Sequence, residues 1–596
     1  MEQSDRAEIM EHVAILRAEL KRQNLDGFII PSSDEFQGEY VPACARRLEW
    51  LTHFSGSAGL AIVLKSKAAF FTDGRYTLQA RNEIAKGFVV HNIANISPAE
   101  WLENHANADD RIAFDPWLFT EQSIQRYMAA AAKRSCRMVP TENLIDRVWK
   151  HRPKPPRSHV VSHPIRYSGW ESAGKREAVA EAMIEAGAEY MVLTAPDSIC
   201  WLLNIRGEDV PHNPFILAHA IIDKEGAVEW FIDAKRVSAS VKRHLGKGVT
   251  LRSPSELNDA LFDLRGRKVM LDPSQAAHGF FAALTRAGAD IVNKTDPCQL
   301  MKARKNKVEV NGAKAAHIRD GRAVVKLLAW LDANVKKGKL TEISVADRLE
   351  SFRKESKELR DLSFDTIAGF GGNGAIVHYR ATNKTNASIK GNGLLLLDSG
   401  GQYPDGTTDI TRTVAIGQPT AEQKKNFTRV LKGHIALASA KFPKGTSGAQ
   451  LDALARMPLW HHGLDFDHGT GHGVGSYLSV HEGPQRISRV SHVPLEPGMI
   501  LSNEPGYYEA GKYGIRIENL VVVKESKEKH TFRTYYEFET ITMVPLDRKL
   551  IDLTLLTKEE VKWLNDYHKK VAQKLGGNGL SAYEREWLAR ATVPLA

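Results

Sequence analysis

Near its start the chain runs from a helical pattern into a short apolar segment, and the same order returns once further on. The first helical pattern ends around Asn24 and is followed by the apolar run 28–30. In the second copy, apolar residues at i, i+3, i+4 and i+7 within 179–186 give one apolar helix face, and the apolar run 190–193 follows. The repeated order predicts two related α/β domains.

Changes in this pattern mark the expected domain boundaries. The proline-rich segment 152–156 cannot continue a helix and suits a stiff linker. A charged stretch near Lys302 opens a long helical pattern, and from about residue 360 short apolar strands alternate with glycine-rich turns. The tail contains an amphipathic helix from Lys558 to Leu575 and is predicted to pack as an appendage. The predicted domains are 1–152, 158–300, 301–534 and 535–596.

Length and composition bound the class of protein. A chain of 596 residues is too long for one hydrophobic core. A hydrophobic content of 42%, a charged content of 26% and a mean hydropathy of -0.33 are those of a globular soluble protein. The sequence contains neither a run of about 20 apolar residues nor a signal-type segment at its start. We therefore expect a cytoplasmic protein without a membrane partner.

The net charge of +10 raises the question of a nucleic-acid partner. Basic residues are spread along the chain, and the only dense run, Lys302 to Lys307, is predicted to be a solvated linker face. The sequence carries no stacking motif, so no nucleic-acid partner is expected.

Four widely spaced cysteines are predicted to be reduced thiols rather than disulfides or metal ligands: Cys44, Cys136, Cys200 and Cys298.

Chemistry begins with two aspartates in a predicted β-hairpin. The apolar run 394–397 ends at Asp398, a turn rich in glycine and aspartate follows, and Asp409 opens an alternating strand. Asp398 is expected to face Asp409 across the ladder. Two close carboxylates without a cation would repel each other and one would take up a proton, so a metal is the simplest resolution.

Three later segments carry further residues of the metal-ligand type. His472 lies with His468 in a segment of alternating glycines, which lets the backbone approach a bound ion closely. Glu504 follows an apolar run, and Glu518 lies in a strand-like stretch. The five predicted metal ligands are Asp398, Asp409, His472, Glu504 and Glu518.

Charge counting predicts two metal ions. Four carboxylates with one neutral imidazole balance two divalent cations, whereas one cation would leave the set strongly anionic. A ligand set with mostly oxygen, one nitrogen and no thiolate suits Mn²⁺ first, with Co²⁺ or Zn²⁺ as alternatives. Two metals about 3.5–4 Å apart can share a water, lower its pKa and clamp the reacting oxygens. Hydrolysis of a polar bond is the expected reaction.

Other polar side chains of the same segment are candidates for catalysis. His378, His468 and His481 are predicted to donate hydrogen bonds to a carbonyl and to its developing oxyanion. Arg516, two residues before Glu518, is expected to project to the same face of a strand and to orient a carboxylate.

These motifs resemble those of the metal-dependent pita-bread peptidases, in particular the long, three-domain Xaa-Pro aminopeptidases (aminopeptidase P). The likeness spans nearly the whole chain, and no metal ligand of the family pattern is missing. The motifs that carry it are RRLEW at 46–50, SGSAG at 55–59, TDGRY at 72–76, WLLNIRG at 201–207, HGTGHG at 468–473 and VHEGP at 480–484.

The resemblance implies two N-terminal creatinase-like α/β domains followed by a catalytic pita-bread domain of mixed α+β structure. It implies that Asp398 chelates one metal, that His472 and Glu504 bind the other, and that Asp409 and Glu518 bridge the two. Glu504 would also handle protons. His378 and His481 would contact the peptide around the scissile bond, His468 would line the site, and Tyr508 would help to wall a proline pocket.

The activity implied by the resemblance is release of an N-terminal residue from a peptide whose second residue is proline. Proline lacks an N–H and its ring fixes φ, so ordinary peptidases handle it poorly. The family also suggests a homodimer. Alternatives are a prolidase, which cleaves only dipeptides, and a pita-bread protein that has lost catalysis and serves as a binding module. Chain length argues against the first, and the intact ligand set against the second.

Overall fold

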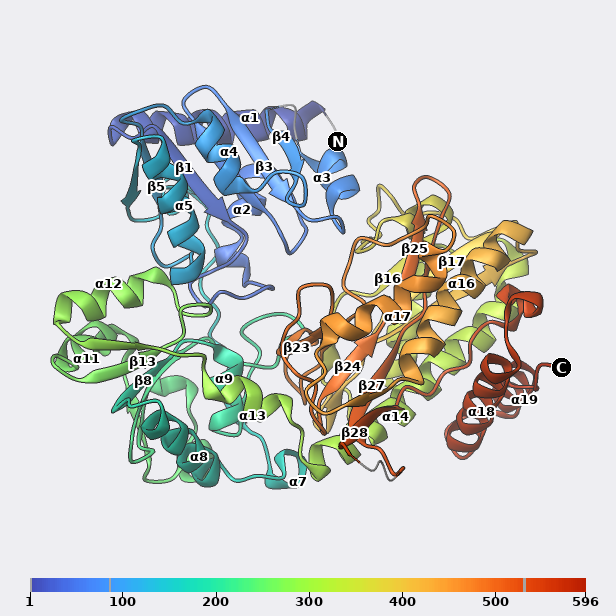
Figure 1. Ribbon diagram of the computed structural model, residues 1–596. Coiled ribbons are helices and arrows are strands. Elements are labelled where there is room, and N and C mark those ends of the chain that lie inside the picture. Colours follow the sequence, from blue (N-terminus) through green and yellow to red (C-terminus); the bar gives the residue numbers. More distant parts are fainter. Residues whose placement is uncertain (1–2, 85–86, 529–531) are drawn as a thin grey trace. The chain divides into compact units, whose positions relative to one another are not determined.

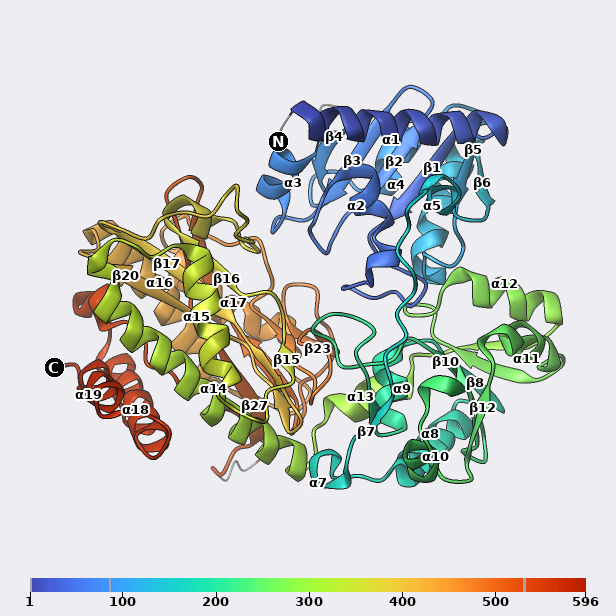
Figure 2. The ribbon, with the colours of Figure 1, turned by 180° about the vertical axis from the view of Figure 1, so that it is seen from behind.

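The protein is described here by a computed structural model that covers residues 3–84, 87–528 and 532–596 (Figures 1 and 2). The chain forms two compact units. The first comprises Met1–His163 and Trp170–Gln299, and the second comprises Pro164–Gly169 and Leu300–Ala596.

The first unit contains two six-stranded sheets with the same topology. In the first sheet, β1 pairs antiparallel with β2 and parallel with β5. In the second, β8 pairs antiparallel with β10 and parallel with β13. The first sheet has the order β4-β3-β2-β1-β5-β6: Val89–Asn92, Ala68–Thr72, Leu60–Leu64, Gly27–Pro31, Arg111–Phe114 and Arg137–Pro140. The second has the order β12-β11-β10-β8-β13-β14: Val249–Arg252, Val228–Phe231, His219–Asp223, Tyr190–Leu193, Lys268–Leu271 and Asp290–Asn293.

A helix precedes the central strand of each sheet, as the repeated pattern predicts. Helix α1 (Gln3–Arg22) leads into β1, and α8 (Ser172–Glu185) leads into β8. Strand β1 is buried along its whole length because helices lie on both sides of its sheet (Figures 1 and 2), which explains its continuous apolar run. The prediction of two related α/β domains is confirmed.

The second unit opens with the long helix α14 (Lys307–Asn334). Asn306 caps it: its side chain accepts hydrogen bonds from the backbone of Val308 and Glu309, while the Glu309 carboxylate accepts from the Asn306 N–H. Two sheets carry the predicted ligands Asp398, in β17, and His472, in β22. The first has the order β16-β17-β20: Ile367–Phe370, Gly393–Ser399 and Ile410–Ile416. The second has the order β21-β28-β27-β24-β22-β23: Lys441–Pro443, Tyr535–Thr540, Asn519–Glu525, Ile500–Asn503, Gly471–Gly473 and Glu482–Ile487.

The C-terminal tail packs against this second unit. Helix α18 (Lys558–Leu575) has the predicted bounds, and α19 (Ala582–Ala591) follows. Leu564 and Val571 of α18 share a buried core with Phe427 of α16 (Ala421–Ala438). The tail is therefore part of the core of this unit.

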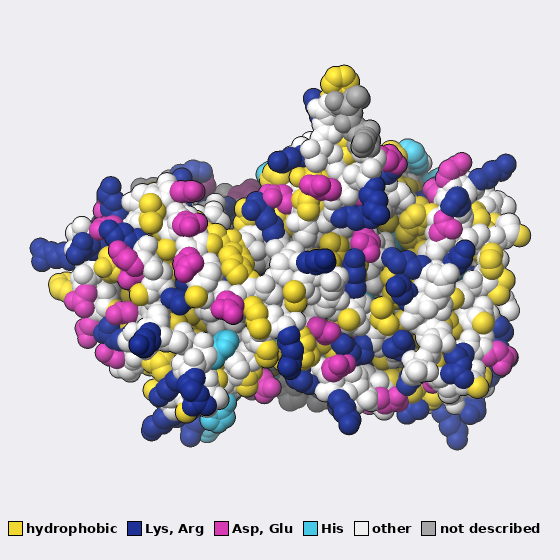
Figure 3. Space-filling view, turned by 90° about the horizontal axis from the view of Figure 1, so that it is seen from below, with side chains coloured by type: hydrophobic (Ala, Val, Ile, Leu, Met, Phe, Trp, Pro, Cys, Tyr) yellow, Lys and Arg dark blue, Asp and Glu magenta, His cyan; other side chains and the backbone are white. Residues whose placement is uncertain are grey.

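The prediction that the basic run 302–307 is a solvated linker face is wrong for Lys302 and Lys305, whereas Arg304 and Lys307 are exposed. Lys302 and Lys305 are buried, with side chains 1% exposed, and both form ion pairs with Glu482. A buried carboxylate removes the cost of burying the ammonium groups, and that partner lies far along the chain. On the face drawn in Figure 3, Lys and Arg side chains are interspersed with Asp and Glu rather than gathered into one basic patch.

All four cysteines are buried, and none of them forms a disulfide, as predicted. Among the described residues, no helix combines the length and the apolar character that crossing a membrane requires.

Candidate metal centre

Asp398 and Asp409 come together through β17 and β20, but not in the register that the hairpin prediction gives. Asp398 lies opposite Thr411, and Asp409 precedes the first residue of β20. The predicted direct pairing is wrong because the intervening turn contains two short strands of its own, β18 (Gly401–Tyr403) and β19 (Gly406–Thr407). Asp409 is instead a diagonal neighbour of Asp398, which still places the two carboxylates on one face.

The other three predicted ligands converge through the register of the six-stranded sheet. Asn503 at the end of β24 pairs with Asn519 at the start of β27, so Glu504 and Glu518 flank the last pair of this ladder. Strand β22 pairs with β24 on its other side, and the His472 N–H donates to Ser502 Oγ at 2.9 Å. The sequence prediction that Glu518 lies within a strand is wrong, since it lies in the link between β26 (Tyr513–Arg516) and β27.

These elements place the ligand atoms within coordinating distance of one another. His472 Nε2 lies 3.4 Å from an oxygen of Asp409 and 3.5 Å from an oxygen of Glu504. Ligand atoms of Asp409, His472 and Glu518 all lie within 4.8 Å of one another. Neither His472 contact is a hydrogen bond, but each fits two ligands of one cation.

Three buried carboxylate oxygens in this group have no hydrogen-bond partner among the described residues: Asp398 Oδ1, Asp409 Oδ1 and Glu518 Oε1. A buried unpaired carboxylate oxygen is costly, and a cation is the partner that removes this cost. Burial and the neighbouring carboxylates raise the pKa of both Asp409 and Glu518 well above the ordinary range. The donor set therefore fits divalent metal ions.

The imidazole of His472 is oriented for a metal. Its Nδ1 lies 2.9 Å from the carbonyl oxygen of Gly473. Because a carbonyl only accepts, Nδ1 carries the proton and Nε2 presents a lone pair toward Asp409 and Glu504. The His481 ring lies edge-on to it, with ring centroids 4.3 Å apart.

A hydrogen-bonded chain runs from Asp398 to His468. Arg516, 1% exposed, donates to Asp398 Oδ2 at 2.6 Å and to the Tyr508 hydroxyl at 2.6 Å. That hydroxyl lies 2.8 Å from Nε2 of His468, and burial raises the pKa of Tyr508 to about 12. Arg516 and Glu518 do not share one strand, so the predicted reason for their proximity is wrong even though Arg516 contacts a carboxylate.

His378 lies apart from these strands in sequence, in the turn after the 3₁₀ helix η5 (Gly371–Ala375), and is half-buried. The residue before it, Val377, accepts a hydrogen bond from Arg516 Nη2 at 3.2 Å. The turn that carries His378 is thereby fixed to the same arginine that contacts Asp398.

Sequence reasoning missed two hydroxyl groups that hold the ligands. Thr411 Oγ1 donates to Glu518 Oε2 at 2.8 Å and accepts from Arg516 Nε at 3.2 Å. Ser502 Oγ donates to Glu504 Oε1 at 3.2 Å. Thr411 lies two residues after Asp409, and Ser502 lies two residues before Glu504. Side chains two residues apart in a strand share a face, so this spacing could have identified both hydroxyl groups from the sequence. Glu482, next to His481, was also missed because its lysine partners are distant in sequence.

Models of known protein families match nearly the whole chain. The model of metallopeptidase family M24 matches residues 311–525, and the C-terminal region of the same peptidases matches 534–595. The creatinase/prolidase N-terminal domain matches twice, at 13–148 and at 151–309.

Individual relatives are similar over their full length. An aminopeptidase P1 of Lotus japonicus is 39% identical, over 96% of this chain and 97% of its own. A probable Xaa-Pro aminopeptidase P of Coccidioides posadasii is 41% identical, over 98% and 99%.

Two solved structures are also similar. The X-prolyl aminopeptidase of Caenorhabditis elegans, described as a cytosolic enzyme with a di-nuclear active site, is 33% identical, with a TM-score of 0.94 over 98% of this chain and 100% of its own. A Xaa-Pro dipeptidase from Bacillus anthracis, 25% identical, covers 63% of this chain and 99% of its own, with a TM-score of 0.53.

Proposed function

The chain belongs to metallopeptidase family M24, and from this premise we infer that it is a metallo-aminopeptidase that releases the N-terminal residue from peptides with proline in second position. The observation that carries the metal-dependent chemistry is the set of unpaired, buried carboxylate oxygens on Asp398, Asp409 and Glu518. Similarity over nearly the full chain to aminopeptidases carries the substrate class.

We propose the following roles for the side chains. Asp398 would chelate one metal, His472 and Glu504 would hold the second, and Asp409 and Glu518 would bridge the two. A pair of divalent ions, when bound, supplies Lewis-acid activation of the scissile carbonyl and of a water. The short chain of hydrogen bonds through Arg516 keeps the Asp398 carboxylate oriented.

The remaining groups act on the peptide and on protons. Glu504 accepts the proton of the attacking water and returns it to the leaving proline nitrogen. His378 and His481 donate hydrogen bonds around the scissile bond, and His468 lines the site. The Tyr508 ring forms one side of the proline pocket. Contacts of its hydroxyl with Arg516 and His468 hold the ring in place.

Manganese is the proposed native metal, because oxygen ligands predominate and thiolate ligands are absent from the described group. The test is reconstitution of metal-stripped protein with Mn²⁺, Co²⁺ or Zn²⁺, followed by an assay of Arg-Pro-Pro cleavage. The highest kcat/KM with Mn²⁺ is expected. Higher activity with Zn²⁺ at saturating metal would contradict the assignment of the metal but not of the reaction.

A prolidase is the second candidate, because a dipeptidase with similar fold covers part of the chain. The same preparation incubated with Arg-Pro-Pro and with Arg-Pro separates the two. We expect cleavage of the tripeptide, whereas cleavage of only the dipeptide would show a prolidase. No hydrolysis of either peptide with any of the three metals would refute the enzymatic function.

We further propose a cytoplasmic homodimer whose domains have the bounds 1–152, 158–300, 301–534 and 535–596. The description of the C. elegans relative as cytosolic supports the location. The homodimer rests on the family resemblance, and light scattering of the purified chain tests it.

A further inference from the structure

A second group of metal-ligand side chains lies in the first unit, on one helix and at the end of another, and includes none of the five predicted ligands. Glu8 and His12 are one turn apart on α1, and His53 follows α2 (Arg47–Thr52). One ligand atom from each residue lies within 4.8 Å of the others. The Glu8 oxygens lie 4.0 Å from His12 Nε2 and 3.8 Å from His53 Nε2. Three donors from two helices thus converge on one point.

The backbone holds His12 in the tautomer that a metal needs. Its Nδ1 lies 2.8 Å from the carbonyl oxygen of Trp50, and its ring stacks on the Trp50 indole at 4.0 Å. The carbonyl can only accept, so Nδ1 carries the proton and the Nε2 lone pair points toward Glu8. A backbone carbonyl behind one nitrogen, with the other nitrogen on the ion, is the usual arrangement of metal-binding histidines.

His53 is held in a backbone conformation that favours glycine. Its φ is 58°, in the left-handed region, and its N–H closes α2 by donating to the carbonyl of Glu49 at 2.7 Å. A side chain at such a position is strained, and such strain concentrates where the side chain is needed. The His53 ring lies edge-on to His12, with ring centroids 6.2 Å apart.

We propose that Glu8, His12 and His53 bind one zinc ion, with a water in the fourth position. Two imidazoles and one carboxylate are a recurrent zinc ligand set. Bonds of about 2.0–2.2 Å at tetrahedral angles bring neighbouring ligand atoms to about 3.3–3.5 Å, so the three separations, all within 4.8 Å, must shorten. The Glu8 oxygens, which lie 4.0 and 3.8 Å from the imidazole nitrogens, must move by roughly 0.3–0.7 Å. The exposed Glu8 side chain can make that movement. Zinc at this site ties α1 to the end of α2.

The alternative is that Glu8 only attracts the two histidines when they are protonated. Zinc content distinguishes the two explanations. The full chain is dialysed against micromolar Zn²⁺, and bound zinc per chain is measured by mass spectrometry for wild type, Glu8→Gln, His53→Asn and His105→Asn. His105 is the matched control, because its Nδ1 lies 2.8 Å from the carbonyl oxygen of Trp101 and its ring stacks on that tryptophan at 4.3 Å.

Wild type and His105→Asn are expected to retain one zinc equivalent more than Glu8→Gln and His53→Asn. All four proteins keep the same M24 ligands, so the difference reports only the proposed site. Zinc should also raise the Tm of the first unit in wild type and leave it unchanged in Glu8→Gln, whose substituted side chain is exposed and does not endanger folding. Equal zinc content in the four proteins, or an equal loss in His105→Asn, would overturn the proposal.

Discussion

At the scale of single residues, a buried group of charges lies next in sequence to the predicted site residue His481. Glu482 follows His481 and is contacted by Lys302 at 3.2 Å and by Lys305, all three with side chains about 1% exposed. Removing one member of such a group leaves an uncompensated charge in the interior, which costs about 3–5 kcal/mol. The strand that begins at Glu482 is thereby fixed directly beside His481.

Arg516 is the residue whose replacement tests the orientation of Asp398. In Arg516→Lys the charge is kept, but one ammonium cannot reach both Asp398 and Tyr508 in the geometry of the planar guanidinium. We expect metal affinity or kcat/KM to fall about 10–100-fold. Metal titration and peptide kinetics measure this, and Arg590→Lys, an exposed arginine paired with Glu586, is the control. Unchanged values in Arg516→Lys would contradict the orienting role.

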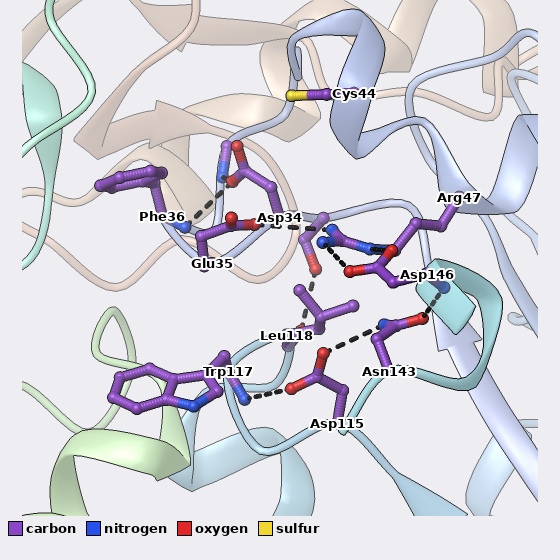
Figure 4. Close-up of polar contacts among 12 residues, drawn as sticks. Asp34, Glu35, Phe36, Cys44, Arg47, Asp115, Trp117, Leu118, Asn143 and Asp146 are labelled. Atoms are coloured by element: carbon purple, nitrogen blue, oxygen red, sulfur yellow. Dashed lines mark hydrogen bonds and ion pairs between the residues drawn. The ribbon is translucent and has the colours of Figure 1, made fainter. Parts of the chain in front are cut away.

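A buried carboxyl of the first unit predicts a pH dependence of stability. Asp34 accepts backbone hydrogen bonds from Phe36 and Gly38 through one oxygen, both at 3.1 Å, and belongs to a polar group with Glu35 and Arg47 (Figure 4). Burial raises the pKa of Asp34 to about 6. Its ionised form is therefore disfavoured in the folded state, so the free energy of unfolding falls as pH rises from about 4 to 6.

Asp34→Asn should remove this dependence. Asparagine keeps the oxygen that accepts both backbone hydrogen bonds but cannot ionise. At pH 8 the variant should gain up to about 3 kcal/mol in the free energy of unfolding of the first unit, with little gain at pH 4. Urea denaturation at several pH values measures this, with the exposed Asp109→Asn as control. An equal effect at pH 4 and pH 8 would contradict the assigned pKa.

At the scale of elements, strand register brings the predicted ligands together, and it requires close backbone approach at Gly471. A Cβ on Gly471 of β22 would lie 2.0 Å from the carbonyl oxygen of Ser502 on β24. A Cβ on Gly469, in the same motif, would meet its nearest atom at 3.6 Å, an ordinary contact. The two glycines of one sequence motif therefore have different structural roles.

Gly471→Ala should separate β22 from β24 and move His472 away from Glu504. Displacement of a ligand by about 1 Å is enough to lower activity about 100-fold, so we expect at least that loss in kcat/KM together with weaker metal binding. Gly469→Ala should keep both within about threefold of wild type, since nothing has to move. Activity and metal titration of the two variants measure this. If both variants showed the same kcat/KM and the same metal affinity, close backbone approach at Gly471 would not determine the geometry of the site.

The sequence predicts elements better than it predicts register. The apolar period places α18 at Lys558–Leu575 because one face of this helix is buried along its length. The Asp398–Asp409 pairing was wrong because the short strands inside the turn shift the ladder, and a turn of that length has no fixed register. Burial of Lys302 could not be predicted because its partner Glu482 is near it only after folding.

At the scale of the whole molecule, the C-terminal appendage is connected to the candidate site through Arg412. This buried arginine donates to the carbonyl oxygen of Glu518 at 2.6 Å and to the Tyr567 hydroxyl of α18 at 2.9 Å. The same hydroxyl lies 2.8 Å from the carbonyl oxygen of Val544. The link that carries Glu518 is therefore held partly by the tail.

Tyr567→Phe should lower the free energy of unfolding of the second unit by about 1–3 kcal/mol, because it leaves buried partners without the hydroxyl. Tyr583→Phe on α19 is the matched control: Tyr583 is 45% exposed and its hydroxyl makes one long contact, 3.3 Å, to the carbonyl oxygen of Ala329. Chemical denaturation measures both. If the two variants lose equal stability, the connection through Arg412 does not hold the tail.

Metal removal should act on the two units differently. All five proposed metal ligands lie in the unit that contains Leu300–Ala596. Without cations, the buried oxygens of Asp398, Asp409 and Glu518 have no partner among the described residues, so chelation should destabilise this region and increase hydrogen exchange of β22, β24 and β27. In the first unit, only α1 and α2 should change if Glu8, His12 and His53 hold zinc. Exchange mass spectrometry before and after chelation resolves these peptides, and restored Mn²⁺ should protect the second unit alone. Unchanged exchange in β22, β24 and β27 would contradict a metal centre there, whatever happens in α1 and α2.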